Sequence, residues 1–308
     1  MNQIIDHYFY IAPQVQEALG EGRPVVALES TVITHGLPYP DNLTAAQSME
    51  DAVREGGAQP ATIGIISGKI HVGLNDDQLA YLANQADKGA RKCSRRDLPL
   101  VLAAGHDAGT TVAATMLLAH RADIPIFATG GIGGVHRGHP FDVSADLTEL
   151  ARTPVAVVCS GAKSVLDLPA TLEVLETNGV PVIGLGTDEI PAFFSRRSGL
   201  AAPARLDTAA DVAATIVAHR ALGLRNGLVV AVPVPAQDEF DPELAEAAIE
   251  QATSEADALG LQGPETTPWL LSRLAELTDG NSLRANVALL ANNGRVAAEI
   301  AVALAAKS

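Results

Sequence analysis

A glycine-rich stretch in the middle of the chain, residues 129–146, carries residue types suited to an anion and a divalent ion. Four glycines within five residues follow an apolar run, and they let backbone N–H groups approach a ligand closely. His136 and Arg137 add positive charge, while Asp142 and Asp146 offer carboxylate oxygens to a hard cation such as Mg²⁺ or Mn²⁺. These features predict a site for a phosphate and a divalent ion. The alternative for the two aspartates is that they favour a helix start through the helix dipole.

Two residues at the ends of other apolar runs are suited to covalent and proton-transfer chemistry. Lys163 lies in residues 160–164, between an expected strand and an expected helix start, and a neutral lysine amine there could form a Schiff base. The alternative is a lysine that pairs with Asp167. Glu29 ends an apolar strand, so its carboxyl should be partly buried, with a raised pKa, and could carry a proton near neutrality. A capping or salt-bridging glutamate is the alternative.

Two nucleotide-binding fingerprints are incomplete. The last glycine of the dinucleotide pattern would fall at His136, and Ala162 stands where a P-loop has its glycine before the lysine. The histidines His35, His136 and His139 have no zinc spacing. We therefore do not expect a nicotinamide cofactor, a P-loop or a zinc centre.

Two further groups are candidates for ligand contact. Lys92, Arg95 and Arg96 form a basic cluster. Such a cluster is usually a solvated charge run, and phosphate binding is favoured here only by the other sites. Asn286 and the pair 292–293 interrupt an alanine-rich stretch, and asparagine is a mediocre helix former. These asparagines either reach the site or bond across helices, and we favour the site for Asn286.

Apolar strands alternate with helices along most of the chain, which predicts an α/β fold with a largely parallel sheet. Ligands in such sheets bind beyond the carboxyl ends of the strands, where Glu29, residues 130–146 and residues 160–163 all fall, so we expect one shared site. The expected strands are 24–29, 61–66, 124–128, 154–159, 180–185 and 227–232, with 98–104 as a further apolar run and 69–72 as a hairpin arm. The expected helices are 13–20, 43–55, 75–85, 110–121 and 167–178, followed by a helical C-terminal part at 207–222, 241–259, 267–278 and 282–306.

Composition narrows the class of protein. The formal net charge is −15, from 21 basic and 36 acidic residues, which argues against nucleic-acid and anionic-membrane partners. Cys93 and Cys159 form no CxxC pair, so no disulfide is expected. The chain shows no signal peptide and no run of about 18 continuously apolar residues. We expect a cytoplasmic protein with one domain over residues 1–308.

Seven stretches, in order along the chain, resemble the pseudouridine-5'-phosphate glycosidases of the indigoidine synthase A-like family. They are ALESTVITHGLPYP (27–40), KCSRRDLP (92–99), ATGGIGGVHRG (128–138), FDVSADLTEL (141–150), VCSGAKSVLDLPATLEVLET (158–177), PAFFSRRSG (191–199) and ANNGRVAAEIA (291–301). The residues His139 and Pro140 are a local departure from the family pattern. The resemblance implies a three-layer α/β/α fold and a homotrimer.

The resemblance also implies a reaction and a set of site residues. The reaction is reversible cleavage of the C–C glycosidic bond of pseudouridine 5'-phosphate to uracil and ribose 5-phosphate, in pseudouridine catabolism. Lys163 would be the nucleophile, Glu29 the proton donor and Asp142 the ligand of Mn²⁺. The substrate contacts that the resemblance implies are Lys92, Val112, Ser144, Ala145, Asp146 and Asn286. His136 and Arg137 are expected substrate contacts because of their positive charge.

In the expected mechanism Lys163 attacks C1', the ribose ring opens, and Glu29 protonates C5 of uracil as the C–C bond breaks. A lysine imine of ribose 5-phosphate remains and is hydrolysed. Rival functions are a Schiff-base phosphosugar lyase or aldolase, and an accessory role in pigment biosynthesis. A kinase-like nucleotide-binding protein is weakened by the two incomplete fingerprints.

Overall fold

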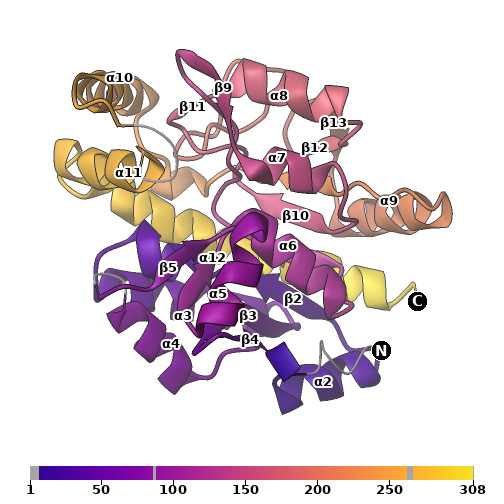
Figure 1. Cartoon of the computed structure of the whole chain (residues 1–308). Coiled ribbons are helices and arrows are strands. Elements are labelled where there is room, and N and C mark those ends of the chain that lie inside the picture. Colours follow the sequence, from indigo (N-terminus) through magenta and orange to yellow (C-terminus); the bar gives the residue numbers. More distant parts are fainter. Residues whose placement is uncertain (1–6, 86–87, 262–265, 308) are drawn as a thin grey trace.

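The structure is a computed structural model and describes residues 7–85, 88–261 and 266–307. In this part of the chain eleven strands form one large sheet (Figure 1): β1 (Phe9–Ile11), β2 (Val25–Leu28), β3 (Gln59–Ile66), β4 (Lys69–Val72), β5 (Arg91–Cys93), β6 (Ala108–Thr110), β7 (Ile126–Ala128), β10 (Ala156–Cys159), β12 (Val182–Leu185), β13 (Ala204–Leu206) and β14 (Leu228–Ala231). A small antiparallel sheet joins β8 (Val135–His136), β9 (His139–Val143) and β11 (Leu166–Asp167).

The large sheet has the order β1-β4-β3-β2-β7-β10-β14-β12-β13, with β6 and β5 attached beside β3. Neighbouring strands are parallel except where β3 meets β4 and β6. The four central strands β2, β7, β10 and β14 are buried along their whole length, as expected of a parallel sheet covered on both faces. The predicted α/β fold with a largely parallel sheet is confirmed.

Helices cover the sheet. They are α2 (Pro13–Gly20), α3 (Asp41–Glu55), α4 (Asp76–Asn84), α5 (Leu98–Ala104), α6 (Val112–Arg121), α7 (Ala145–Leu150), α8 (Leu168–Thr177), α9 (Ala209–Ala221), α10 (Pro242–Ala258), α11 (Thr266–Leu277) and α12 (Asn281–Ala305), with short helical turns η1 (Val32–Gly36), η2 (Arg95–Asp97) and η3 (Ala236–Asp238). Helix α6 packs on β2, β3 and β7, whereas α12, between α3 and α9, packs on β2, β7 and β10. This arrangement gives the three α/β/α layers.

The C-terminal helix α12 is long and apolar enough to cross a membrane by length and composition alone, and over half of its most apolar window is buried inside the molecule. Its buried residues belong to the main hydrophobic cluster, which extends along the described chain from Ala12 to Leu304. The helical C-terminal part predicted from the sequence is therefore attached to the sheet through this helix.

Three local predictions are wrong. The apolar run 98–104 is helix α5 and not a strand, because Ser94 and Asp97 form a capping box ahead of it and Gly105, at φ 67°, ends it. Lys163 does not lie at a helix start, since β11 intervenes and Asp167 caps α8 by accepting a hydrogen bond from the Ala170 amide.

The third concerns the two aspartates of the glycine-rich stretch, which one interpretation placed together at a helix start. Asp142 lies on strand β9, whereas Asp146 lies in the first turn of α7, whose N-cap is Ser144. The two carboxylates therefore come from different elements and have separate surroundings.

Candidate active site

Three adjacent parallel strands bring the expected functional segments together. In the registers, Leu28 of β2 pairs with Ala128 of β7, and Ala128 pairs with Val158 of β10. Glu29 and Thr129 therefore leave neighbouring strands at the same edge of the sheet, and residues 160–163 follow the third strand. The predicted convergence of these segments is confirmed.

The lysine loop and the glycine-rich loop are tied to each other by backbone contacts. Ile132 and Ala162 form an isolated parallel bridge, and the Lys163 amide donates to the Ile132 carbonyl at 3.1 Å. Only glycine fits at Gly161 in this loop, because its φ is 79° and a Cβ there would lie 2.3 Å from the Pro191 carbonyl oxygen. Lys163 is thereby fixed beside the glycine-rich loop.

The basic residue Lys92 reaches the same edge by a less obvious route. Strand β3 is longer than its neighbour β2, which ends at Leu28. Beyond that point β6 takes the place of β2 and pairs with the second half of β3. The Ser30 hydroxyl joins the two strands by donating to the Ile63 carbonyl at 2.7 Å and accepting from the Thr110 amide at 2.9 Å. Strand β5 pairs in parallel with β6 and carries Lys92 toward Glu29.

Glu29 is the buried acid of the site. Only 8% of the residue is exposed, and burial raises the pKa of its carboxyl, against the opposing charges of Lys163 and Lys92 and a hydrogen bond from Thr129. The Thr129 hydroxyl donates directly to Glu29 Oε1. The predicted burial and raised pKa are confirmed, and the carboxyl can hold a proton closer to neutrality than an exposed glutamate.

Two lysines approach this acid. Burial, with the nearby charge of Lys163, lowers the pKa of Lys92 to about 8, while Asp146 and Glu29 act in the opposite direction. Lys163 is half-buried, and within the described residues no hydrogen bond or ion pair engages its amine. The amine therefore has no such interaction with these residues to lose when it attacks a bound electrophile.

Glu29, Lys92 and Lys163 line one narrow cavity of about 40 Å³, which has room for a few water molecules. The other lining residues include Thr129, Gly131, Phe193, Leu271, Asn286 and Leu290. A much wider opening, about 700 Å³, lies beside it between β9 and the helices α10 and α11. The chemistry belongs to the narrow cavity, because the acid and both amines converge there and the wide opening holds none of the three.

Asp146 organises the backbone around the site. Its Oδ1 accepts from the Ala113 amide at 3.0 Å and its Oδ2 from the Gly133 amide at 2.8 Å, so it joins the glycine-rich loop to the start of α6. A Cβ on Gly133 would lie 2.2 Å from Ser144 Oγ, and only glycine fits. Both carboxylate oxygens of this predicted substrate contact are therefore already engaged by the protein backbone.

The remaining predicted contacts are distributed over three places. Asn286 of α12 lines the narrow cavity and is 7% exposed. Val112 and Ala145 are the first residues of α6 and α7, which pack together beside the glycine-rich loop. Ser144 accepts a hydrogen bond from the Asp146 amide and caps α7.

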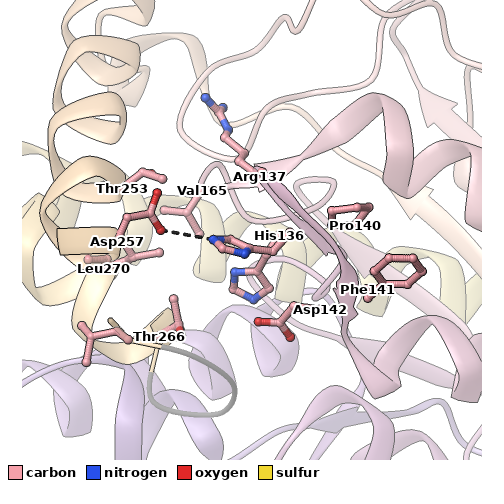
Figure 2. Close-up of a pocket in the computed structure, with 14 residues that line it drawn as sticks. His136, Arg137, Pro140, Phe141, Asp142, Val165, Thr253, Asp257, Thr266 and Leu270 are labelled. Carbon is pink, nitrogen blue, oxygen red and sulfur yellow. Dashed lines mark hydrogen bonds and ion pairs between the residues drawn. The ribbon is translucent and has the colours of Figure 1, made fainter. Parts of the chain in front are cut away.

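Arg137 lies outside the narrow cavity and hydrogen-bonds the residues that follow Lys163. Its guanidinium donates to the carbonyls of Ser164 at 3.0 Å and Leu166 at 3.2 Å, and it pairs with Glu246 of α10. In Figure 2 its side chain points away from Asp142. The structure thus gives this arginine a contact with the residues that follow Lys163, apart from any substrate.

His136 and Asp142 face the wide opening (Figure 2). Burial lowers the pKa of His136, and the negative charge of Asp142 opposes that effect. In the described part of the chain no group of three or more His, Cys, Asp or Glu side chains could hold a metal ion. One carboxylate beside an open space suits a hard cation that keeps most of its waters, and it does not suit a closed zinc site.

Two polar residues of the site had no role assigned from the sequence. Thr129, the first residue of the glycine-rich stretch, holds Glu29. Asn293 belongs to the asparagine pair for which site contact and bonding between elements both stayed open. It is fully buried in α12, and its amide reaches the ends of β7 and β10.

A buried acid and a lysine amine face one cavity at the carboxyl edge of a parallel sheet, the place where α/β proteins bind their ligands. The sequence profile of the family described as Indigoidine synthase A like protein matches residues 14–303. The chain belongs to this family.

Relatives with the same printed name span nearly the whole chain. A pseudouridine-5'-phosphate glycosidase from Herpetosiphon aurantiacus is 55% identical over 96% of this chain and 97% of its own. That of Solibacter usitatus is 56% identical over 96% of this chain and 98% of its own. That of Caldanaerobacter subterraneus subsp. tengcongensis is 53% identical over 99% of this chain and 98% of its own.

Two solved structures share the fold. An indigoidine synthase A-like protein from Thermotoga maritima is 39% identical, with a TM-score of 0.87 and 96% of each chain covered. A prealnumycin C-glycosynthase, solved in complex with ribulose 5-phosphate, is also 39% identical, with a TM-score of 0.89 and coverage of 100% of this chain and 99% of its own.

Proposed function

We propose that this protein is a pseudouridine-5'-phosphate glycosidase, which reversibly cleaves the C–C glycosidic bond of its substrate to uracil and ribose 5-phosphate. The observation that carries the proposal is the shared cavity of Glu29 and Lys163. Relatives that are more than half identical and bear this name support it, as does a structural neighbour that holds a pentulose phosphate.

The cavity supplies the two groups that the reaction needs. Carbon is a poor leaving atom, so an ordinary pair of carboxylates, as used for O-glycosides, is not sufficient. The Lys163 amine attacks C1', the C1'–O4' bond breaks, and O4' takes up a proton as the ring opens. The nitrogen lone pair then forms a C=N bond while C1'–C5 breaks and Glu29 gives its proton to C5 of uracil. Water hydrolyses the resulting imine to free Lys163 and ribose 5-phosphate.

Substrate entry requires the cavity to widen, because a few waters occupy much less space than a nucleotide. Leu271 of α11 and Phe193 line the cavity, and their apolar side chains can move without the loss of a hydrogen bond. Displacement of α11, with its Leu271 side chain, would open the narrow cavity toward the wide opening, which α11 also borders through Leu270.

The test of the proposed function follows uracil release from pseudouridine 5'-phosphate by chromatography, with ribose 5-phosphate measured as the second product. Equal amounts of both products are expected, and the reverse reaction should consume them. Cleavage of other phosphosugars without uracil release would instead identify a Schiff-base lyase or aldolase. Absence of any turnover would favour an accessory role in pigment biosynthesis.

We infer that Lys92 contacts the substrate phosphate, since it is a half-buried cation beside the catalytic pair. With a pKa of about 8, its charged fraction falls about tenfold between pH 7 and pH 9. We therefore expect kcat/KM of the wild-type protein to fall over this range more steeply than that of Lys92→Arg, whose guanidinium stays charged. Steady-state kinetics at fixed ionic strength measure both profiles.

The ratio of the two profiles isolates the lysine, because Glu29 contributes equally to both proteins. A ratio of wild type to Lys92→Arg that stays constant from pH 7 to pH 9 would contradict the assignment of Lys92 to the phosphate.

We also infer that Asp142 anchors one hydrated Mn²⁺, whose charge would help to neutralise a phosphate near Lys92. The protein's part is to hold the ion by a single carboxylate and to place His136 beside it. Asp142→Asn should weaken Mn²⁺ binding at least about tenfold in isothermal titration calorimetry, because the charged ligand is lost.

Asp257→Asn is the matched control, since Asp257 lines the same opening and bonds His139 at 3.2 Å. Its Mn²⁺ affinity should stay close to that of the wild type. Equal losses in both variants would show that the opening attracts the ion only by general charge.

We retain the homotrimer and the cytoplasmic location as proposals. Phe141 on β9 is 99% exposed and lies beside the wide opening, which is unusual for a phenylalanine and suits a subunit contact. The two cysteines are free and buried, which suits a reducing compartment.

A further inference from the structure

We propose that Asn293 is a positioning residue that sets the geometry between Glu29 and Lys163. It clamps the loop that leads to Lys163 to the loop whose Thr129 holds Glu29. The proposal rests on the proposed function, because it assigns the buried amide a role in that reaction. Asn293 belongs to α12, whereas both catalytic residues follow strands of the sheet. The two segments that Asn293 connects follow strands β7 and β10.

The contacts of Asn293 are directed at both loops. Its Nδ2 donates to the Thr129 carbonyl at 2.9 Å and to Ser160 Oγ at 3.1 Å, and its Oδ1 accepts from Ser160 Oγ at 3.3 Å. The Gly130 carbonyl lies 3.4 Å from the same nitrogen. The residue is fully buried, so no solvent competes for these groups.

Each residue that Asn293 bonds is linked directly to a catalytic residue or to its loop. Thr129, whose carbonyl Asn293 holds, uses its hydroxyl to hold Glu29. Ser160 begins the loop that leads to Lys163, and its own amide donates to the Gly130 carbonyl at 2.8 Å. A shift of the Asn293 amide would therefore move the acid's hydrogen-bond donor and the lysine loop together.

The surroundings of Asn293 on α12 also favour this role. Most of the buried face of this helix is alanine, leucine, isoleucine and valine, and alanine would favour the helix more than asparagine does. The Thr129 carbonyl lies where β7 ends and faces this helix, and Asn293 supplies its donor. The Gly130 carbonyl already accepts from the Ser160 amide.

Replacement by aspartate gives the sharpest test, because it keeps the shape and changes the hydrogen-bonding. A carboxylate at this position would face carbonyl oxygens and could not donate to them, whereas the protonated acid could donate once. Asn293→Asp should therefore be impaired at high pH and partly recover as pH falls. Asn293→Ala lacks the group altogether and should not recover.

The experiment measures kcat and KM for uracil release between pH 5.5 and 8.5 in the wild type, Asn293→Ala, Asn293→Asp and the control Asn292→Ala. Asn292 is the adjacent residue of the same helix and contacts the Pro233 carbonyl at 3.3 Å, away from both loops. We expect kcat of Asn293→Ala to fall about 10- to 100-fold, as for loss of one or two buried hydrogen bonds, with KM changed less than about threefold. Asn292→Ala should stay within about threefold of the wild type.

A second readout needs no turnover. The titration midpoint of Glu29, followed by ¹³C NMR of its labelled carboxyl, should rise in Asn293→Ala, because a displaced Thr129 hydroxyl no longer favours the charged form. Unchanged kcat with an unchanged midpoint would overturn the proposal. So would equal losses in Asn292→Ala, or an Asn293→Asp pH profile parallel to that of the wild type.

The two failures are distinguishable. A wild-type protein that releases no uracil contradicts the proposed function, and the Glu29 midpoint then decides the positioning role by itself. A wild-type protein that releases uracil, together with variants that match it in kcat and midpoint, contradicts the positioning role alone. Melting temperatures of all four proteins separate either result from misfolding, and the isosteric Asn293→Asp variant guards against a cavity left by alanine.

Discussion

Lys163→Ala is expected to lower kcat for uracil release at least about 10⁴-fold, equivalent to about 5.5 kcal/mol in the barrier. The loss is large because Lys163 supplies the nucleophilic amine of the proposed mechanism, while Lys92, which lines the same cavity, is assigned to the phosphate. Lys163→Arg should be equally inactive, since a guanidinium keeps its proton and cannot form an imine. The measurement is single-turnover release of uracil from excess enzyme.

Lys69→Ala is the matched control, because Lys69 is exposed on β4 and far along the sheet order from β10. It should retain wild-type rates. Residual activity within about tenfold of wild type in Lys163→Ala would mean that another residue supplies the nucleophile, with Lys92 as the neighbour to examine first.

Glu29→Gln is expected to lower kcat for uracil release about 10²- to 10⁴-fold, the range found for loss of a general acid. Imine formation from ribose 5-phosphate should persist in this variant, because that step needs the lysine and the sugar aldehyde but no proton at C5. The two reactions, followed side by side, separate the role of the acid from that of the amine. Loss of both to the same extent would indicate a disrupted cavity.

The raised pKa of Glu29 gives the pH dependence its sign. The acid form is the donor, so kcat should fall as pH rises through the pKa of Glu29 in the substrate complex. The same shift affects folding: the group stabilises the protein fully below its unfolded-state pKa and loses that contribution as pH rises through the folded value. Glu29→Gln cannot ionise and should melt at a higher temperature than wild type at pH 8, with the difference closing in acid.

Much of the fold could be read from apolar periodicity. The strands β2, β7, β10 and β14 and the helices α2, α4, α8 and α12 lie within a few residues of their predicted ranges, since each is long or strongly apolar. Strands β5 and β6 were missed because three residues are too few to show a period of two. The run at α5 was misread because its capping box lies in a charged segment that resembled a loop.

The site was predictable only where it depends on topology alone. Glu29 and Lys163 follow buried strands, and parallel sheets bring such ends together. Lys92 joins them because β3 outruns β2, which no local pattern reveals. The backbone partners of Asp146 and Arg137 come from other elements, so the sequence could not distinguish these charges from ligand contacts.

The most direct test of the central claim is reduction with borohydride in the presence of ribose 5-phosphate, followed by peptide mass spectrometry. We expect one reduced pentose phosphate on the peptide that contains Lys163, and none in Lys163→Ala. Absence of this adduct, or its appearance on Lys92 while Lys163 stays unmodified, would show that Lys163 is not the nucleophile.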